Sequence, residues 1–176
     1  MGYETLNQGG AAMKRRSPFS LILILSIVLL GITGPAWAGD KEDVAAAMNM
    51  WKQDLAAGTP ENPGKILSLY AKDGVLWGTI SPTRRDTPEA IRDYFVNAYK
   101  KLPKLTVTFQ DPYIRVYGNT AINTGYYTFS FMKDGKPTTL PARYSFVYVK
   151  QGGKWLIADH HSSAMPAPPA APTAPK

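Results

Sequence analysis

Hydrophobic residues in the first part of the chain recur every three or four positions, the period of an amphipathic helix. The first such stripe consists of Val44, Met48, Trp51 and Leu55. Gly58 follows the stripe, where a helix commonly ends. The spacing predicts one helix that ends near Gly58 and a second, short helix over residues 63–71.

A third helix is predicted by its start signal. Thr87 can cap the helix with its hydroxyl, Pro88 suits the first helical position, and Glu89 supplies an early acid. Pro103 ends the pattern. The inward stripe of this helix consists of Ile91, Tyr94, Phe95, Ala98 and Leu102. Before it, Asp73-Gly74 predicts a turn into a strand over residues 75–80.

From Lys104 onward the hydrophobic period changes to two, which indicates strands. Glycine-containing turns separate these segments, and Lys133-Asp134-Gly135 is a strong hairpin signal. The predicted strands are 105–109, 113–117, 121–132, 142–149 and 155–162. Helices followed by an antiparallel meander predict an α+β domain, with a pocket between the sheet and the long helix.

The first 38 residues have the layout of a secretory signal peptide. A basic segment at residues 13–16 precedes an apolar run at 21–30, and Ala36-Trp37-Ala38 is a small-x-small cleavage site. The alternative is a membrane-spanning helix over residues 17–38. The short apolar run, its helix-breaking end and the cleavage site favour a signal peptide. We therefore expect a periplasmic or secreted protein that meets the membrane only before cleavage.

At the other end, residues 165–176 are rich in proline and alanine and predict an extended, disordered tail. The folded domain is thus expected over residues 39–164. Its composition is that of a globular protein, since the 176-residue chain is 44% hydrophobic and 19% charged. The net charge is +7, but beyond the signal segment no basic cluster exceeds a pair, which argues against nucleic-acid binding.

The chain has no cysteine and only two histidines, the adjacent His160 and His161. In a strand, Asp159, His161 and Ser163 share one face, and His160 and Ser162 share the other. The two rings therefore cannot enter one pocket unless a bulge intervenes. A conventional zinc site lacks ligands, although one histidine with carboxylates could hold a harder metal weakly. A structural role, with one ring buried and the other exposed, remains the simple alternative.

Polar groups also interrupt other predicted core elements. Thr79 follows the strand that precedes the third helix, and Tyr94 lies on that helix's inward stripe. Arg143 and Tyr144 open an otherwise apolar strand; an inward Arg143 would bind an anion, whereas an outward one would reach water. The loop arginines Arg84 and Arg85 are expected to be solvated.

These residues together resemble the bacterial relatives of the calcium/calmodulin-dependent protein kinase II association domain. The resemblance spans residues 43–166 and includes the segments 69–79, 91–95, 125–129, 142–148 and 160–166. It implies the cone-shaped nuclear transport factor 2-like fold, in which a curved sheet wraps a long helix. It also implies a homodimer or a higher homo-oligomer.

Within that group, a secreted stand-alone domain ending in His-His-Ser-Ser-x-Met-Pro, here residues 160–166, is similar to the iota-class carbonic anhydrases. The resemblance implies reversible hydration of CO2 to bicarbonate, with zinc or manganese in some members and no metal in others. In the metal-free members a Thr, a Tyr and a Ser surround bicarbonate. By position these are Thr79, Tyr94 and either Ser162 or Ser163.

The ligand count favours a metal-free reaction. We hypothesise that the hydroxyls orient a water beside CO2, that His160 or His161 relays the proton, and that Arg143 and Tyr144 bind the substrate. Two alternatives remain: a non-catalytic ligand-binding or oligomerisation module, and another enzyme such as a polyketide cyclase or isomerase. The latter would use the pair Asp159 and His161.

Overall fold

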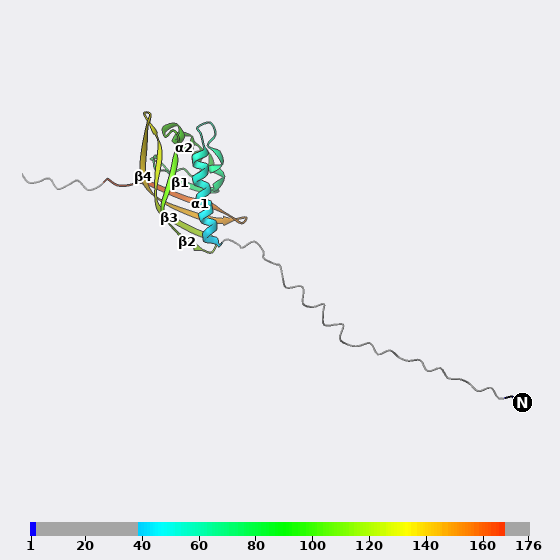
Figure 1. The fold of residues 1–176 in the computed structure, drawn as a ribbon. Helices are drawn as coiled ribbons and strands as arrows, with labels where there is room; N and C mark the ends of the chain where they lie inside the picture. The colour runs from blue at the N-terminus through cyan, green and yellow to red at the C-terminus, as the bar shows by residue number, and fades with distance from the viewer. Residues whose placement is uncertain (3–38, 168–176) are drawn as a thin grey trace, which may run out of the picture. The chain divides into compact units, whose positions relative to one another are not determined.

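A computed structural model describes residues 1–2 and 39–167 of the chain. Residues 3–38 of the predicted signal peptide and residues 168–176 of the predicted tail therefore lie outside the described residues. The domain consists of α1 (Asp40–Ala57), the 3-10 helix η2 (Gly64–Leu69), β1 (Tyr70–Trp77), α2 (Pro88–Lys101), β2 (Thr106–Tyr117), β3 (Thr120–Lys133), β4 (Lys136–Gln151) and β5 (Lys154–Ala164) (Figure 1). In the described part, no helix is long and apolar enough to cross a membrane.

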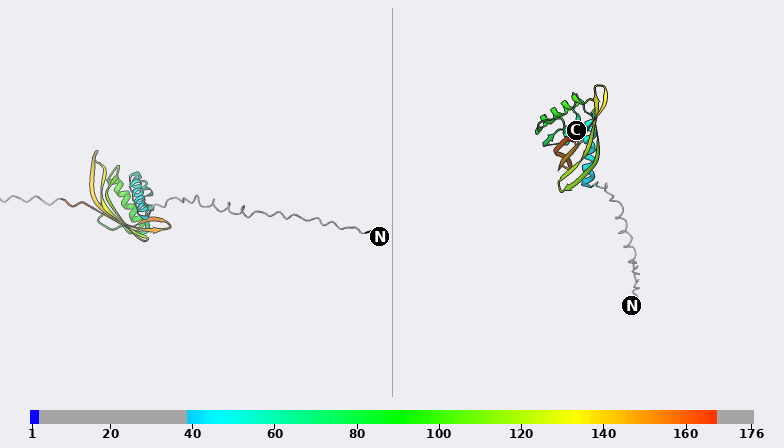
Figure 2. Two further views of the ribbon diagram at one scale, coloured as in Figure 1. Left: turned by 60° about the horizontal axis from the view of Figure 1, so that its bottom comes forward. Right: turned by 90° about the vertical axis from the view of Figure 1, so that its left-hand side faces the viewer.

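The five strands form one sheet in the order β1-β5-β4-β3-β2. Strands β2 to β5 are antiparallel neighbours, which confirms the predicted meander. β1 adds a parallel strand at the edge, beside β5. Both α1 and α2 lie on the same side of the curved sheet (Figure 2). The architecture is the α+β, nuclear transport factor 2-like fold expected from the sequence.

The helical prediction for residues 63–71 was wrong at its end. The 3-10 helix stops at Leu69, and Tyr70 begins β1 opposite Ile157 of β5. Asp73-Gly74 is not a turn but lies within β1, where the register with β5 is irregular. A Cβ on Gly74 would lie 2.9 Å from the carbonyl oxygens of Ala71 and Ile157, so this backbone approach requires glycine. Pairing with a strand distant in sequence overrides the local pattern here.

The other predicted elements were found with small changes. The predicted strands 105–109 and 113–117 are one strand, β2, with a register shift between Gln110 and Tyr113. Thr87 caps α2, because its Oγ1 accepts a hydrogen bond from the Ala90 N–H at 3.2 Å. The helix ends at Lys101, just before Pro103.

The core lies between the helices and the inner face of the sheet. Trp51 of α1 is 1% exposed and meets Phe146 of β4 edge-on, with ring centroids 5.4 Å apart. Phe95 of α2 is also fully buried and packs against Tyr70 of β1. The two helices thus close one aromatic core over the sheet, and any polar group placed there is shielded from water.

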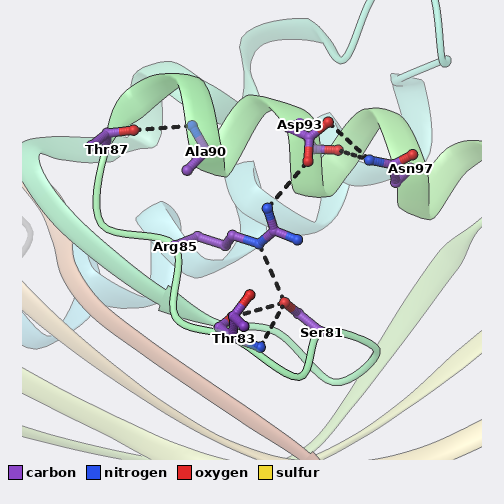
Figure 3. Close-up of polar contacts among 7 residues, drawn as sticks. All are labelled: Ser81, Thr83, Arg85, Thr87, Ala90, Asp93 and Asn97. Carbon is purple, nitrogen blue, oxygen red and sulfur yellow. Dashed lines mark hydrogen bonds and ion pairs between the residues drawn. The ribbon is translucent and has the colours of Figure 1, made fainter.

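The loop between β1 and α2 is tied to the body by Arg85 (Figure 3). Its Nε donates to Ser81 Oγ at 3.2 Å, and its Nη1 lies 3.2 Å from Asp93 Oδ2 on α2. The expectation of a solvated charge fits Arg84, which is exposed, but not the partly buried Arg85. Arg85 therefore holds in place the loop that carries Thr79.

Candidate active site

At the end of β5, successive side chains alternate between the buried and the outer face of the sheet, as predicted. His160 and Ser162 are buried, with 3% and 6% of their surfaces exposed, whereas His161 is exposed and Ser163 is half-buried. Ser162 rather than Ser163 therefore faces the interior. Likewise, only His160 of the histidine pair enters the core.

His160 and Ser162 line a small cavity between the two helices and the sheet. The space open to the centre of a water-sized molecule is about 20 Å³, so the cavity suits very small molecules. Thr79, Tyr94 and Tyr127 supply the other polar side chains. The remaining wall is mostly apolar and consists of Trp51, Leu55, Ile80, Phe95, Ala98, Leu102, Leu105, Phe129 and Leu140. The cavity thus combines a polar side with a hydrophobic side, at the size of a very small ligand.

Ser162 is the centre of a hydroxyl network. Its Oγ accepts a hydrogen bond from the Tyr127 hydroxyl and is hydrogen-bonded to Thr79 Oγ1. The Tyr127 ring is stacked on Tyr144, with centroids 4.9 Å apart and an interplanar angle of 2°. Tyr144 does not line the cavity; its hydroxyl donates to the buried Asn123 Oδ1 at 3.2 Å. Tyr144 therefore positions Tyr127 and does not itself line the cavity, and its expected role in substrate binding stays a prediction.

Tyr94 lies across the cavity on α2, as predicted. Burial raises the pKa of its hydroxyl to about 12, although the backbone of Ile80 and the charge of Arg85 act in the opposite direction. The hydroxyl therefore stays protonated at neutral pH and can donate a hydrogen bond. Its ring lies directly against Gly78, at the end of β1.

Gly78 is required by this close approach. A Cβ at position 78 would overlap the Tyr94 ring, so Gly78→Ala is expected to displace that ring and destabilise the fold by about 1–3 kcal/mol. Gly58→Ala is the matched control, because its Cβ would overlap Tyr99, outside the cavity, in the same way. Urea unfolding should show both losses. Activity per folded molecule should fall only in Gly78→Ala, and equal activities would contradict the placement of Tyr94.

His160 is held by a chain of two hydrogen bonds. The Tyr70 hydroxyl lies 2.8 Å from His160 Nδ1, and Trp51 Nε1 donates to that hydroxyl at 3.3 Å. The other ring nitrogen, Nε2, is buried and has no hydrogen-bond partner within residues 39–167. Burial, with a smaller effect of His161, lowers the His160 pKa to about 3. The ring is therefore neutral at physiological pH.

The outer face of the sheet holds the other predicted site residues. Arg143 is exposed and its Nε donates to Ser163 Oγ at 3.1 Å, so it takes the outward of the two orientations considered for it and does not line the cavity. Its neighbours Ala142 and Tyr144 point inward, and strand alternation turns Arg143 outward. His161 is also on the outer face, with Asp159 two residues before it on the same strand face. The acid–base pair of the isomerase alternative is thus outside the cavity.

The donor set does not fit a bound metal ion. Within residues 39–167 no three His, Asp or Glu side chains come together. His160 is the one metal-ligating side chain among the cavity residues, and its Nδ1 is already bonded to Tyr70. Zinc is held by four protein ligands in structural sites and by three in catalytic sites, and the described residues that line the cavity include no carboxylate that would join His160 in holding a harder ion such as manganese.

Sequence reasoning missed Tyr127, Tyr70 and Trp51, which complete the site. Each is an aromatic residue in a core pattern, and nothing local marks it as a hydrogen-bonding partner. Tyr127 lies at an inward position of β3, two residues before Phe129, so its alternation could have placed its hydroxyl in the pocket.

Comparisons with known proteins agree with this fold. The family described as the calcium/calmodulin-dependent protein kinase II association domain matches residues 40–166. A solved structure from Xanthomonas campestris, described as such an association domain, is 41% identical, with a TM-score of 0.65, over 73% of this chain and 90% of the other. No curated protein matches the chain.

More distant structures share the fold alone. One from Novosphingobium aromaticivorans, described as an aromatic ring hydroxylase, is 20% identical with a TM-score of 0.63, over 72% of this chain and 90% of the other. One from Streptomyces avermitilis, described as a dehydratase of the nuclear transport factor 2-like family, is 16% identical with a TM-score of 0.64, over 73% and 97%. The matched residues 40–166 include both helices and all five strands, and the chain belongs to the calcium/calmodulin-dependent protein kinase II association-domain family.

Proposed function

We propose that the protein hydrates CO2 reversibly to bicarbonate without a metal ion, as the similarity to iota-class carbonic anhydrases implies. The observation that carries this proposal is the cavity itself. Thr79 and Tyr94, which the resemblance selects, and Ser162, which burial selects from the two serines it left open, all line one small cavity. A polyketide would not fit into so small a cavity without rearrangement of the core.

The two sides of the cavity suit the two reactants. CO2 is apolar overall and would lie against the hydrophobic wall formed by residues such as Phe95 and Leu140. The hydroxyls of Thr79 and Ser162 would hold a water molecule beside its carbon. Orientation of two reactants in this way supplies much of the rate enhancement in many enzymes.

The bond changes in this step balance without a redox partner. The water oxygen forms a bond to carbon, while one C=O electron pair moves onto oxygen. The protonated hydroxyl of Tyr94 would stabilise that charge by hydrogen bonding. One water proton leaves through Ser162 and Thr79 to solvent at the half-buried start of the β1–α2 loop. The product is bicarbonate, and the proton is taken up by buffer.

The direct test is stopped-flow measurement of CO2 hydration with purified protein that has been treated exhaustively with chelator. We expect hydration well above the buffer rate, and no increase when zinc or manganese is added back. Activity that appears only with added metal would contradict the metal-free reaction. Absence of activity in both conditions would leave a non-catalytic small-ligand-binding module of the same fold.

We also propose a homo-oligomer, at least a dimer, formed through the outer face of the sheet. Membership of an association-domain family supports this. Strand register places Trp77, Tyr113 and Tyr126 on that face, and they are 44%, 64% and 50% exposed. Aromatic side chains this exposed are favourable contacts for a second copy of the chain.

Light scattering after gel filtration tests the oligomer. Tyr126→Glu should shift the mass toward that of a monomer, because it places a charge in the centre of the proposed contact. Lys133→Glu, at the exposed end of β3, is the control and should keep the wild-type mass. A wild-type protein that is monomeric at all concentrations would contradict the proposal.

Export to the periplasm or the medium is the remaining proposal, and it rests on the sequence of residues 1–38. Amino-terminal sequencing of the protein recovered from its natural host should begin at Gly39. Recovery of uncleaved protein from membranes would contradict it.

A further inference from the structure

The hydrogen bonds around His160 determine which of its nitrogens carries the proton. Trp51 Nε1 is only a donor, so the Tyr70 oxygen accepts from it. Tyr70 is 7% exposed, and its own proton needs an acceptor. His160 Nδ1, at 2.8 Å, is the acceptor in reach. When Nδ1 accepts, a neutral imidazole must carry its proton on Nε2.

We infer that Trp51 and Tyr70 lock His160 as the Nε2–H tautomer, so that His160 acts in the cavity as a hydrogen-bond donor. The opposite tautomer would have Nδ1–H donate to Tyr70, which would leave the Tyr70 proton buried without an acceptor among residues 39–167. That arrangement costs a buried unsatisfied donor, of the order of 1–3 kcal/mol in proteins. The hydrogen bonds from Trp51 to Tyr70 and from Tyr70 to His160 Nδ1 avoid this cost.

In this tautomer, the unpartnered Nε2–H of His160 can donate a hydrogen bond to a ligand. It is buried and has no partner in the described part of the chain, and the ring lines the cavity. With Nδ1 turned to Tyr70, the Nε2–H is available to an acceptor atom inside the cavity. A small planar oxyanion such as bicarbonate offers such an oxygen. For catalysis, which rests on the proposed function, His160 would bind the developing anion instead of relaying the proton, and Trp51 and Tyr70 are positioning residues.

Nitrogen NMR tests the tautomer without any substrate. The chain has two histidines, so His161→Gln leaves a single imidazole to assign. At neutral pH we expect the His160 Nε2 resonance in the protonated, pyrrole-type range and Nδ1 in the unprotonated, pyridine-type range. The reverse assignment, or a charged ring, would overturn the inference. Because no activity is measured, a protein without CO2 hydration would contradict the proposed function and leave this result unaffected.

Tyr70→Phe tests whether the Tyr70 hydroxyl determines the tautomer of His160, and Tyr148→Phe is its matched control. Tyr148 is a fully buried tyrosine whose hydroxyl has no partner within residues 39–167 and is not bonded to His160. In the His161→Gln background, Tyr70→Phe should give a mixture of both tautomers, and bicarbonate binding followed by carbon NMR should weaken about tenfold. Tyr148→Phe should keep the wild-type tautomer and affinity.

An unchanged tautomer in folded Tyr70→Phe would overturn the positioning role. If Tyr70→Phe does not fold, as judged by circular dichroism, the tautomer of the otherwise unchanged protein still decides the inference. Equal loss of affinity in both tyrosine variants would assign the effect to packing and would also overturn it.

Discussion

Ser162→Ala is expected to lower the rate of CO2 hydration about 100-fold, the largest loss of any single hydroxyl in the cavity. Ser162 Oγ is bonded to both Thr79 and Tyr127, so its removal frees two polar groups and opens the network that would hold the reacting water. Leaving those groups unpaired should also destabilise the fold by about 1–3 kcal/mol. Rates must therefore be compared per folded molecule.

Ser163→Ala is the control that the chain itself provides. Ser163 follows Ser162 on β5, has the same chemistry, and faces the opposite side of the sheet, where it accepts from Arg143. Its rate should stay within about twofold of the wild-type value, as for most surface substitutions. The measurement is stopped-flow hydration with the fraction folded taken from circular dichroism. Similar losses in both variants would show that the alternation of β5 does not determine the activity.

The distinction between these two serines shows what the sequence could predict. Alternation along a strand separates His160 and Ser162 from His161 and Ser163 without any structure, and the observed burial agrees. It could not say which pair faces inward. That depends on the pairing of β5 with both β4 and β1, and β1 starts more than eighty residues earlier in the chain.

The hydrogen-bond partners were harder to predict for the same reason. Thr79 reaches Ser162 because β1 lies parallel to β5, whereas the local pattern predicted a strand beginning only at residue 75. Tyr70 was assigned to a helix, and in the structure it opens β1 and contacts His160. Contacts between strands distant in sequence leave no periodic pattern in the sequence. A buried tyrosine is therefore predicted to be an ordinary core residue even when its hydroxyl forms a hydrogen bond.

The buried imidazole leads to a prediction about pH. An unfolded histidine has a pKa near 6.5, and burial lowers that of His160 to about 3 in the folded protein. Between these values the unfolded state binds a proton that the folded state does not, so protonation favours unfolding. Above pH 6.5 the ring is neutral in both states, so His160 does not lower the free energy of unfolding. That free energy falls as the pH is lowered from 6.5 toward 3. Between pH 7 and pH 4 the loss is about 3 kcal/mol.

Asparagine variants separate this effect from other titrating groups. Asp159 acts in the opposite direction, because burial raises its pKa and the folded carboxyl binds its proton first as the pH falls. His160→Asn keeps an oxygen near Nδ1 to accept from Tyr70 but cannot titrate, whereas His161→Asn removes the exposed ring. For each protein, the free energy of urea unfolding is measured at pH 7 and at pH 4. The decrease between the two pH values should be about 3 kcal/mol smaller in His160→Asn than in the wild type and in His161→Asn. The same difference in all three would mean that His160 is accessible to protons in the folded state. If His160→Asn does not fold, the wild-type His160 resonances should remain those of a neutral ring down to pH 4, since its pKa is about 3.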